Sequence, residues 1–208
     1  MIKSNRQALP LWFFTSYFRL LQKLLFRKVT FVVENSLPDG PVLLLQNHFS
    51  WWDGYWSYYI AEKLLSRKFH VMMLEKELRK RMFLTRTGAF SVDPDGKGVV
   101  SSLRYAADLL SDSSKLVALY PQGKIESHFL SSIEFKPGAE SLLRLSPSNV
   151  QVIFAAAHIH YGAPARPEAF IYIRHIALTP GSTLQEAYNQ FYRETRNFVI
   201  EKSKSDEA

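Results

Sequence analysis

The chain has 208 residues, 47% of them hydrophobic, which excludes a disordered chain and favours a single domain with one sizeable core. It contains no cysteine, which excludes disulfides, thiolate zinc sites and a cysteine nucleophile. A formal net charge of +7 favours an anionic partner: acidic lipid headgroups, an acidic carrier protein, a phosphorylated or CoA-type substrate, or nucleic acid. No signal-peptide pattern is present, so we expect a cytoplasmic location.

The N-terminal segment, residues 1–28, is rich in Leu, Trp, Phe and Tyr, with Arg19 and Lys23 between them. Its uncharged part, residues 7–18, is shorter than the about 20 apolar residues that a membrane-spanning helix needs. We therefore expect a helix that lies in the membrane interface, with its cationic side chains reaching the headgroups. The alternative is a first helix that packs on the protein's own core. The side chains expected to enter the acyl region are Trp12, Phe13, Phe14, Phe18, Leu21, Leu24, Leu25 and Phe26.

The remaining chain alternates between predicted strands and predicted helices. Short apolar runs predict strands at 29–33, 42–45, 68–73, 89–92, 116–120, 150–157 and 169–173. Helical periodicity predicts helices at 51–65, 75–85, 99–110 and 138–145. A capping box of Ser182 and Gln185 predicts the start of a last helix. This alternation predicts an α/β domain over residues 29–201, with helices covering a largely parallel sheet, and a flexible tail at 202–208. Ligands should then collect beyond the carboxyl ends of the strands.

His48 and Asp53 follow the buried strand at 42–45 and lie five positions apart, a spacing that does not place both on one helix face. They must therefore straddle a strand end and a helix start. A neutral imidazole takes a proton from an alcohol near neutral pH, and a carboxylate on its other ring nitrogen fixes the tautomer. With Ser50 as the N-cap, Asp53 either turns back to His48 or caps backbone N–H groups. For this pair alone, a structural hydrogen bond is the favoured interpretation.

Three further segments follow strands at the same predicted sheet edge. In the run Tyr120-Pro121-Gln122-Gly123-Lys124, the glycine allows a close backbone approach and the lysine offers a cation. The run Phe135-Lys136-Pro137-Gly138-Ala139 opens a helix whose N-terminus attracts an anion beside Lys136. The third is Thr87-Gly88-Ala89-Phe90-Ser91-Val92-Asp93. Taken singly, the first of these motifs is ordinary turn chemistry.

The four blocks in this order, over residues 31–161, resemble the family of glycerol-3-phosphate and lysophospholipid acyltransferases. The resemblance implies that His48 is the general base and that Asp53 orients it. It implies that Tyr120, Pro121, Gln122 and Gly123 bind the acceptor. The implied reaction moves a fatty acyl group from CoA or acyl carrier protein to a hydroxyl of a glycerolipid such as lysophosphatidate, with no resident cofactor. We expect a peripheral protein on the cytoplasmic face of the inner membrane, with membrane lipids and acyl carrier protein as partners.

The departures from the family pattern concern the acceptor. Gln122 replaces the usual acidic residue, residues 124–126 replace Thr-Arg-Ser, and Pro94 replaces an arginine. Two arginines that would clamp a phosphate are thus absent at their expected places, and lysine does not reproduce a bidentate guanidinium fork. An alternative acceptor is a non-phosphate lipid hydroxyl, on a glycolipid or a glycosylated carotenoid. The cations expected to replace the arginines at the substrate site are Lys124, Lys136, Lys97, Arg81, Lys76 and Arg86.

Other classes of function compete with this hypothesis. A peripheral protein that binds membrane lipid without catalysis would keep the same fold. No nucleic-acid motif is present, so we expect no nucleic-acid partner. No Gly-x-Ser-x-Gly elbow supports a serine hydrolase. We expect no metal site, because no cluster of acids accompanies the histidines, which are interpreted as surface or structural: His70, His158, His160 and His175.

Overall fold

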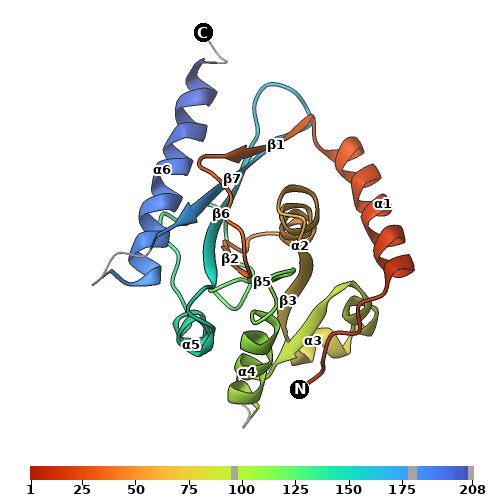
Figure 1. Ribbon diagram of the computed structural model, residues 1–208. Helices are drawn as coiled ribbons and strands as arrows, with labels where there is room; N and C mark the ends of the chain where they lie inside the picture. The colour runs from red at the N-terminus through yellow and green to blue at the C-terminus, as the bar shows by residue number, and fades with distance from the viewer. Residues whose placement is uncertain (95–97, 178–181, 206–208) are drawn as a thin grey trace.

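The computed structural model describes residues 1–94, 98–177 and 182–205. Its centre is a seven-stranded sheet in the order β1-β7-β6-β2-β5-β3-β4 (Figure 1). From β6 to β4 all neighbours are parallel, whereas β7 is antiparallel to β6 and pairs in parallel with β1. The predicted α/β class with a largely parallel sheet is confirmed. The strands are β1 (Lys28–Val33), β2 (Val42–Gln46), β3 (Lys68–Leu74), β4 (Ala89–Val92), β5 (Lys115–Leu119), β6 (Gln151–His160) and β7 (Glu168–Ile176).

Helices cover both faces of the sheet, α1 and α2 on one side and α4, α5 and α6 on the other (Figure 1). Strand β2 shows why, because Val42 and Leu44 pack into the first layer while Leu43 and Leu45 pack into the second. An uninterrupted apolar run is what a strand buried on both faces requires. The helices are α1 (Ala8–Leu25), α2 (Trp52–Tyr59), which continues as the π-helical turn η1 (Ile60–Leu64), α3 (Glu75–Arg79), the 3₁₀ helix η2 (Met82–Thr87), α4 (Val99–Leu109), α5 (Gly138–Leu145) and α6 (Leu184–Ser205).

The prediction of a single helix over residues 75–85 is wrong. It divides into α3 and η2, and Arg81 between them leaves helical geometry with φ −138° and ψ 49°. Leu78 is fully buried whereas Met82 and Phe83 are exposed, so no continuous apolar face extends along the segment. The chain instead turns back to the sheet edge for β4.

The last helix also differs in detail from its prediction. Its capping box is formed by Thr183 and Glu186, each accepting the other's backbone N–H, and not by Ser182 and Gln185. Gln185 instead accepts a hydrogen bond from the backbone N–H of Phe135, at 2.7 Å. The helix continues to Ser205, so the predicted tail begins inside it, and residues 206–208 lie outside the described part of the chain.

The helix α1 has one buried and one exposed stripe. Leu11 and Phe18 are buried, and the Phe18 ring packs against the ring of Tyr55 in α2. The outer stripe carries large apolar side chains that nothing covers in the described structure: Leu9, Trp12, Phe13, Leu20 and Leu24. In the described part of the chain, none of the helices is long and apolar enough to cross a membrane.

Candidate active site

Asn47 fixes the end of β2 from which His48 leaves the sheet. Its side-chain Nδ2 donates to the carbonyl of Ala157 at 2.9 Å, and its Oδ1 accepts the N–H of the same residue at 2.8 Å. Gln46, the last residue of β2, pairs with Ala155 of β6. One residue further along, the Asn47 side chain takes the place of a backbone partner for β6. Because Asn47 is buried, this two-bond clamp holds the backbone that carries the imidazole.

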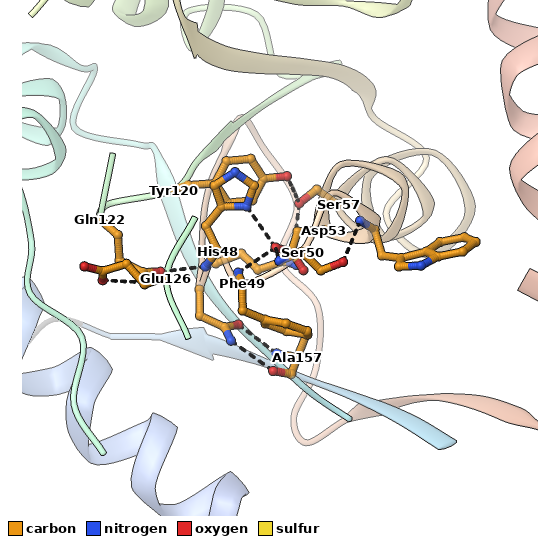
Figure 2. Close-up of polar contacts among 12 residues, drawn as sticks. His48, Phe49, Ser50, Asp53, Ser57, Tyr120, Gln122, Glu126 and Ala157 are labelled. Atoms are coloured by element: carbon orange, nitrogen blue, oxygen red, sulfur yellow. Dashed lines mark hydrogen bonds and ion pairs between the residues drawn. The ribbon is translucent and has the colours of Figure 1, made fainter. Parts of the chain in front are cut away.

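Asp53 performs both roles that the sequence left open. Its Oδ2 lies 2.8 Å from Nδ1 of His48 and also accepts the backbone N–H groups of Phe49 and Ser50, each at 2.9 Å (Figure 2). The carboxyl group is fully buried, and this burial raises the pKa of Asp53, whereas the hydrogen bond from His48 acts in the opposite direction. The N-cap of α2 is Trp51 and not the predicted Ser50, whose hydroxyl accepts the N–H of Trp52.

The carboxylate also determines which imidazole nitrogen is available. A carboxylate accepts hydrogen bonds, so the proton of a neutral His48 lies on Nδ1 and points to Asp53. The lone pair of Nε2 is then free to accept a proton from another molecule. The His48 side chain is 20% exposed, whereas that of Asp53 is 0% exposed, so the imidazole is the part of the pair that an incoming group reaches.

Tyr120 holds the face of the same imidazole. The two rings stack with centroids 4.3 Å apart and planes inclined by 16°. The Tyr120 hydroxyl lies 3.0 Å from Oγ of Ser57, which in turn donates to Oε1 of Gln46 at 2.7 Å. Burial, and then the nearby Asp53 carboxylate, raise the pKa of Tyr120, so its hydroxyl remains protonated and donates into this chain.

Gln122 attaches the next loop to the backbone of His48. Its Oε1 accepts the N–H of His48 at 2.6 Å, and its Nε2 donates to Oε2 of Glu126 at 2.8 Å. Glu126 closes the arrangement, because its own N–H donates to the carbonyl of His48 at 2.8 Å. Gln122 is 3% exposed, so both ends of its amide serve this internal bridge. Lys124 forms an ion pair with Glu126 at 3.0 Å.

Other predicted site residues lie on the loop of this bridge or outside it. Arg81 lies between α3 and η2, and Lys97 lies outside the described residues. The carbonyl of Pro121 accepts the N–H of Lys136 at 2.8 Å, which brings the two loops together. Gly123 has φ +71°, a conformation that favours glycine, and its open side faces Cγ of Lys136. Gly138 is the first residue of α5.

The structure separates the last two predicted cations from that group. Lys76 is exposed in α3, which follows the carboxyl end of β3. It therefore lies at the same edge of the sheet as His48, but β5 separates β3 from β2. Arg86 is exposed in η2, which precedes the amino end of β4, whereas His48 follows the carboxyl end of β2. The site that the described contacts connect therefore comprises the dyad, residues 120–124 and Lys136.

Four residues of this site had no role predicted from the sequence: Gln46, Asn47, Ser57 and Glu126. Their signal was available in part, because Gln46 and Asn47 end a strongly apolar strand and Ser57 interrupts an aromatic helix. A polar side chain in a buried segment needs a partner, and each of these has one. Which partner it takes depends on strands and loops far away in the sequence.

A crevice of about 330 Å³ opens beside the dyad segment. It lies between the carboxyl end of α1 and the connection from β6 to β7, and Ser50 contributes its only hydroxyl apart from that of Tyr161. The lining residues are Leu25, Phe26, Ser50, Trp52, Ile159, Tyr161 and Pro167. Among residues 1–94, 98–177 and 182–205, no cluster of three or more His, Asp or Glu side chains is placed to hold a metal ion.

Comparison with known protein families gives one match. The model of the family described as Acyltransferase matches residues 28–159, which include β1, the dyad, residues 120–124 and nearly all of β6. No curated protein matches the chain. The residues outside the matched range include α1 and α6.

Proposed function

Because the chain belongs to the Acyltransferase family, we propose that it transfers a fatty acyl group from an acyl thioester, on CoA or acyl carrier protein, to a hydroxyl of a membrane lipid. The observation that carries this proposal is the 2.8 Å contact between Nδ1 of His48 and the buried Asp53 carboxylate. It leaves Nε2 as the only ring nitrogen of His48 that can take the hydroxyl proton.

In the proposed reaction, the hydroxyl oxygen attacks the thioester carbonyl carbon while Nε2 of His48 takes the hydroxyl proton. A C–O bond forms, and the tetrahedral intermediate collapses with cleavage of the C–S bond. The imidazolium then returns the proton to the departing thiolate, which restores the neutral imidazole. Asp53 stabilises the imidazolium through Nδ1, and Tyr120 presents its ring face to the same cation.

The test is a transfer assay in which labelled acyl-CoA and acyl carrier protein are each offered with a panel of lipid alcohols. We expect His48→Ala to lower kcat by about 10²- to 10⁴-fold, the usual contribution of a general base. Asp53→Asn should also lower kcat, because an amide no longer favours the tautomer with the proton on Nδ1. His175→Gln is the matched control, since His175 contacts Gln151 in another part of the sheet.

Equal activity of wild type and His48→Ala would remove His48 from the mechanism. If wild type transfers no acyl group from either donor to any acceptor but still binds lipid vesicles, a non-catalytic lipid-binding protein becomes the better account.

A second part of the proposal places α1 in the interface of an anionic membrane, on its cytoplasmic face. Trp12 and Phe13 are 66% and 69% exposed, a costly arrangement in water for side chains of this size. Arg19 and Lys23 are exposed on the same helix, where their charges would meet acidic headgroups. The carboxyl end of α1 also borders the crevice that Ser50 and Trp52 line, and in this proposal the crevice receives the acyl chain.

A further inference from the structure

Charged side chains near His48 bear on which lipid can serve as the acceptor. Figure 2 shows Gln122 and Glu126 on the side of His48 opposite Asp53. The side chain of Glu126 is 20% exposed, and its two oxygens contact Nε2 of Gln122 and Nζ of Lys124. Hydrogen bonds from Gln122 and then from Lys124 lower the pKa of Glu126. Glu126 is therefore ionised at neutral pH, and Gln122 joins this second carboxylate to the backbone of His48.

Glu126 also binds Lys124, a cation of the same loop. Lys124 is held at 3.0 Å from Oε1 of Glu126, so a phosphate that approached it would compete with an ion pair already formed. Lys136 also acts toward Glu126, because its charge contributes to the lowered pKa of that carboxyl group. Lysine provides a single ammonium and lacks the planar fork with which arginine holds a phosphate.

Gln122 and Glu126 are matched to each other. The amide of Gln122 accepts from the N–H of His48 and donates to Glu126 at the same time. A glutamate at position 122 would still accept from His48, but it would place two carboxylates in contact. The negative charge is thus assigned to position 126, at the partly exposed end of the bridge.

From this arrangement we infer that the acceptor carries its reactive hydroxyl on an uncharged, hydroxyl-rich headgroup, and that Glu126 selects against acceptors with a phosphate next to that hydroxyl. A phosphate monoester bears about −1.5 to −2 charges at pH 7, so a carboxylate on this side of the dyad repels it. Neutral hydroxyl groups instead donate to a carboxylate. The inference rests on the proposed acyl transfer and replaces the lysophosphatidate expected from the family resemblance.

The experiment compares lysophosphatidate with monoacylglycerol, which differ only by the phosphate. We expect wild type to have the higher kcat/KM with monoacylglycerol. Glu126→Gln should shift the ratio of the two kcat/KM values toward lysophosphatidate by about tenfold or more, because a carboxylate is removed and Lys124 is released. Glu134→Gln is the matched control, since Glu134 is an exposed glutamate of the same loop, and it should keep the wild-type ratio.

The double variant Gln122→Glu with Glu126→Gln tests the bridge itself. It keeps an acceptor for the N–H of His48 and restores a donor–acceptor pair between the two side chains, so it should be more active than Gln122→Glu alone. A higher activity of the single variant would contradict the assigned bridge.

The two proposals fail in different ways. A wild type that prefers lysophosphatidate, with a ratio that Glu126→Gln leaves unchanged, overturns the inference and leaves acyl transfer intact. If wild type transfers no acyl group to these two lipids or to any other alcohol of the panel, the proposed function is overturned. In that case, the inference is tested by binding of micellar lysophosphatidate and monoacylglycerol to the His48→Ala protein. The inference requires that adding Glu126→Gln to this protein strengthens lysophosphatidate binding about tenfold.

Discussion

The ring of Tyr120 lies almost parallel to the imidazole of His48, with centroids 4.3 Å apart. Asp53 holds the edge of the same imidazole through Nδ1. The two contacts constrain the ring in different directions, one within its plane and one perpendicular to it. Because the hydroxyl of Tyr120 is itself held by Ser57, the stacking surface is fixed to α2, the helix that also carries Asp53.

Tyr120→Leu should lower kcat by about 2- to 30-fold, which corresponds to the loss of a cation–π contact with the imidazolium. Tyr120→Phe keeps the stacked ring and loses only the hydrogen bond to Ser57, so its effect on kcat should be smaller. Steady-state acyl transfer over a range of pH measures both variants. If the phenylalanine variant lost as much activity as the leucine variant, the hydroxyl and not the ring face would be the important group.

Asn47→Asp should destabilise the fold by about 1–3 kcal/mol, because the side chain can no longer donate to the carbonyl of Ala157 and a buried polar group loses its partner. The loss should also lower kcat, since His48 is the next residue along the backbone. Urea unfolding together with the transfer assay measures both effects. Unchanged stability with full activity would show that β2 and β6 are held together without this clamp.

The protein should lose stability in mild acid, because two of its histidines are buried. Burial lowers the pKa of His70 from its usual 6.5 to about 4, and that of His158 to about 3. Below pH 6.5 the unfolded chain therefore takes up protons that the folded chain does not, and the free energy of unfolding falls as the pH falls. At pH 5 each histidine should contribute a loss of about 2 kcal/mol.

The variant His158→Gln separates this effect from general acid denaturation. Its free energy of unfolding should fall between pH 7 and pH 5 by about 2 kcal/mol less than that of wild type, as measured by urea titration at both pH values. An identical fall in the two proteins would mean that His158 binds a proton equally well in the folded and unfolded chain.

Gly88→Ala should destabilise the fold by more than about 3 kcal/mol. Gly88 has φ +115°, and a Cβ there would overlap the backbone carbonyl oxygen of Phe69. Gly54→Ala in α2 is the contrasting variant, because a Cβ at that position meets no atom within 4 Å. It should raise stability by about 0.5–1 kcal/mol. Thermal unfolding of both variants checks the difference in sign.

The proposed position of α1 predicts that Trp12→Glu combined with Phe13→Glu weakens binding to vesicles of phosphatidylglycerol and phosphatidylethanolamine by at least about tenfold. Val100→Glu is the control, since Val100 is an exposed apolar residue of α4 on the other side of the sheet. Vesicle flotation measures the bound fraction. If the control variant lost binding to the same extent, net charge and not α1 would govern the association.

Local patterns in the sequence predicted most of the elements. The apolar run of β2 and the helical period of α4 depend only on residues close together in the chain, so their burial pattern is already present in the sequence. The same is true of the position of His48 and Asp53 across a strand end and a helix start. A candidate general base could be identified at this level because such a base is recognised by residue type and by a neighbouring carboxylate.

The tertiary structure decided which side chains complete the site. Gln122 lies 74 positions from His48, and Asn47 lies 110 positions from its partner Ala157. No local spacing encodes such pairs, because they form only when parallel strands bring distant loops to one edge of the sheet. The same packing turned Gln122 into a support for the backbone and paired Lys124 with Glu126. The sequence by itself determined that a histidine and an aspartate lie five positions apart after a buried strand, because that spacing is local. The fold determined which distant side chains and charges surround them, because only packing brings those loops together.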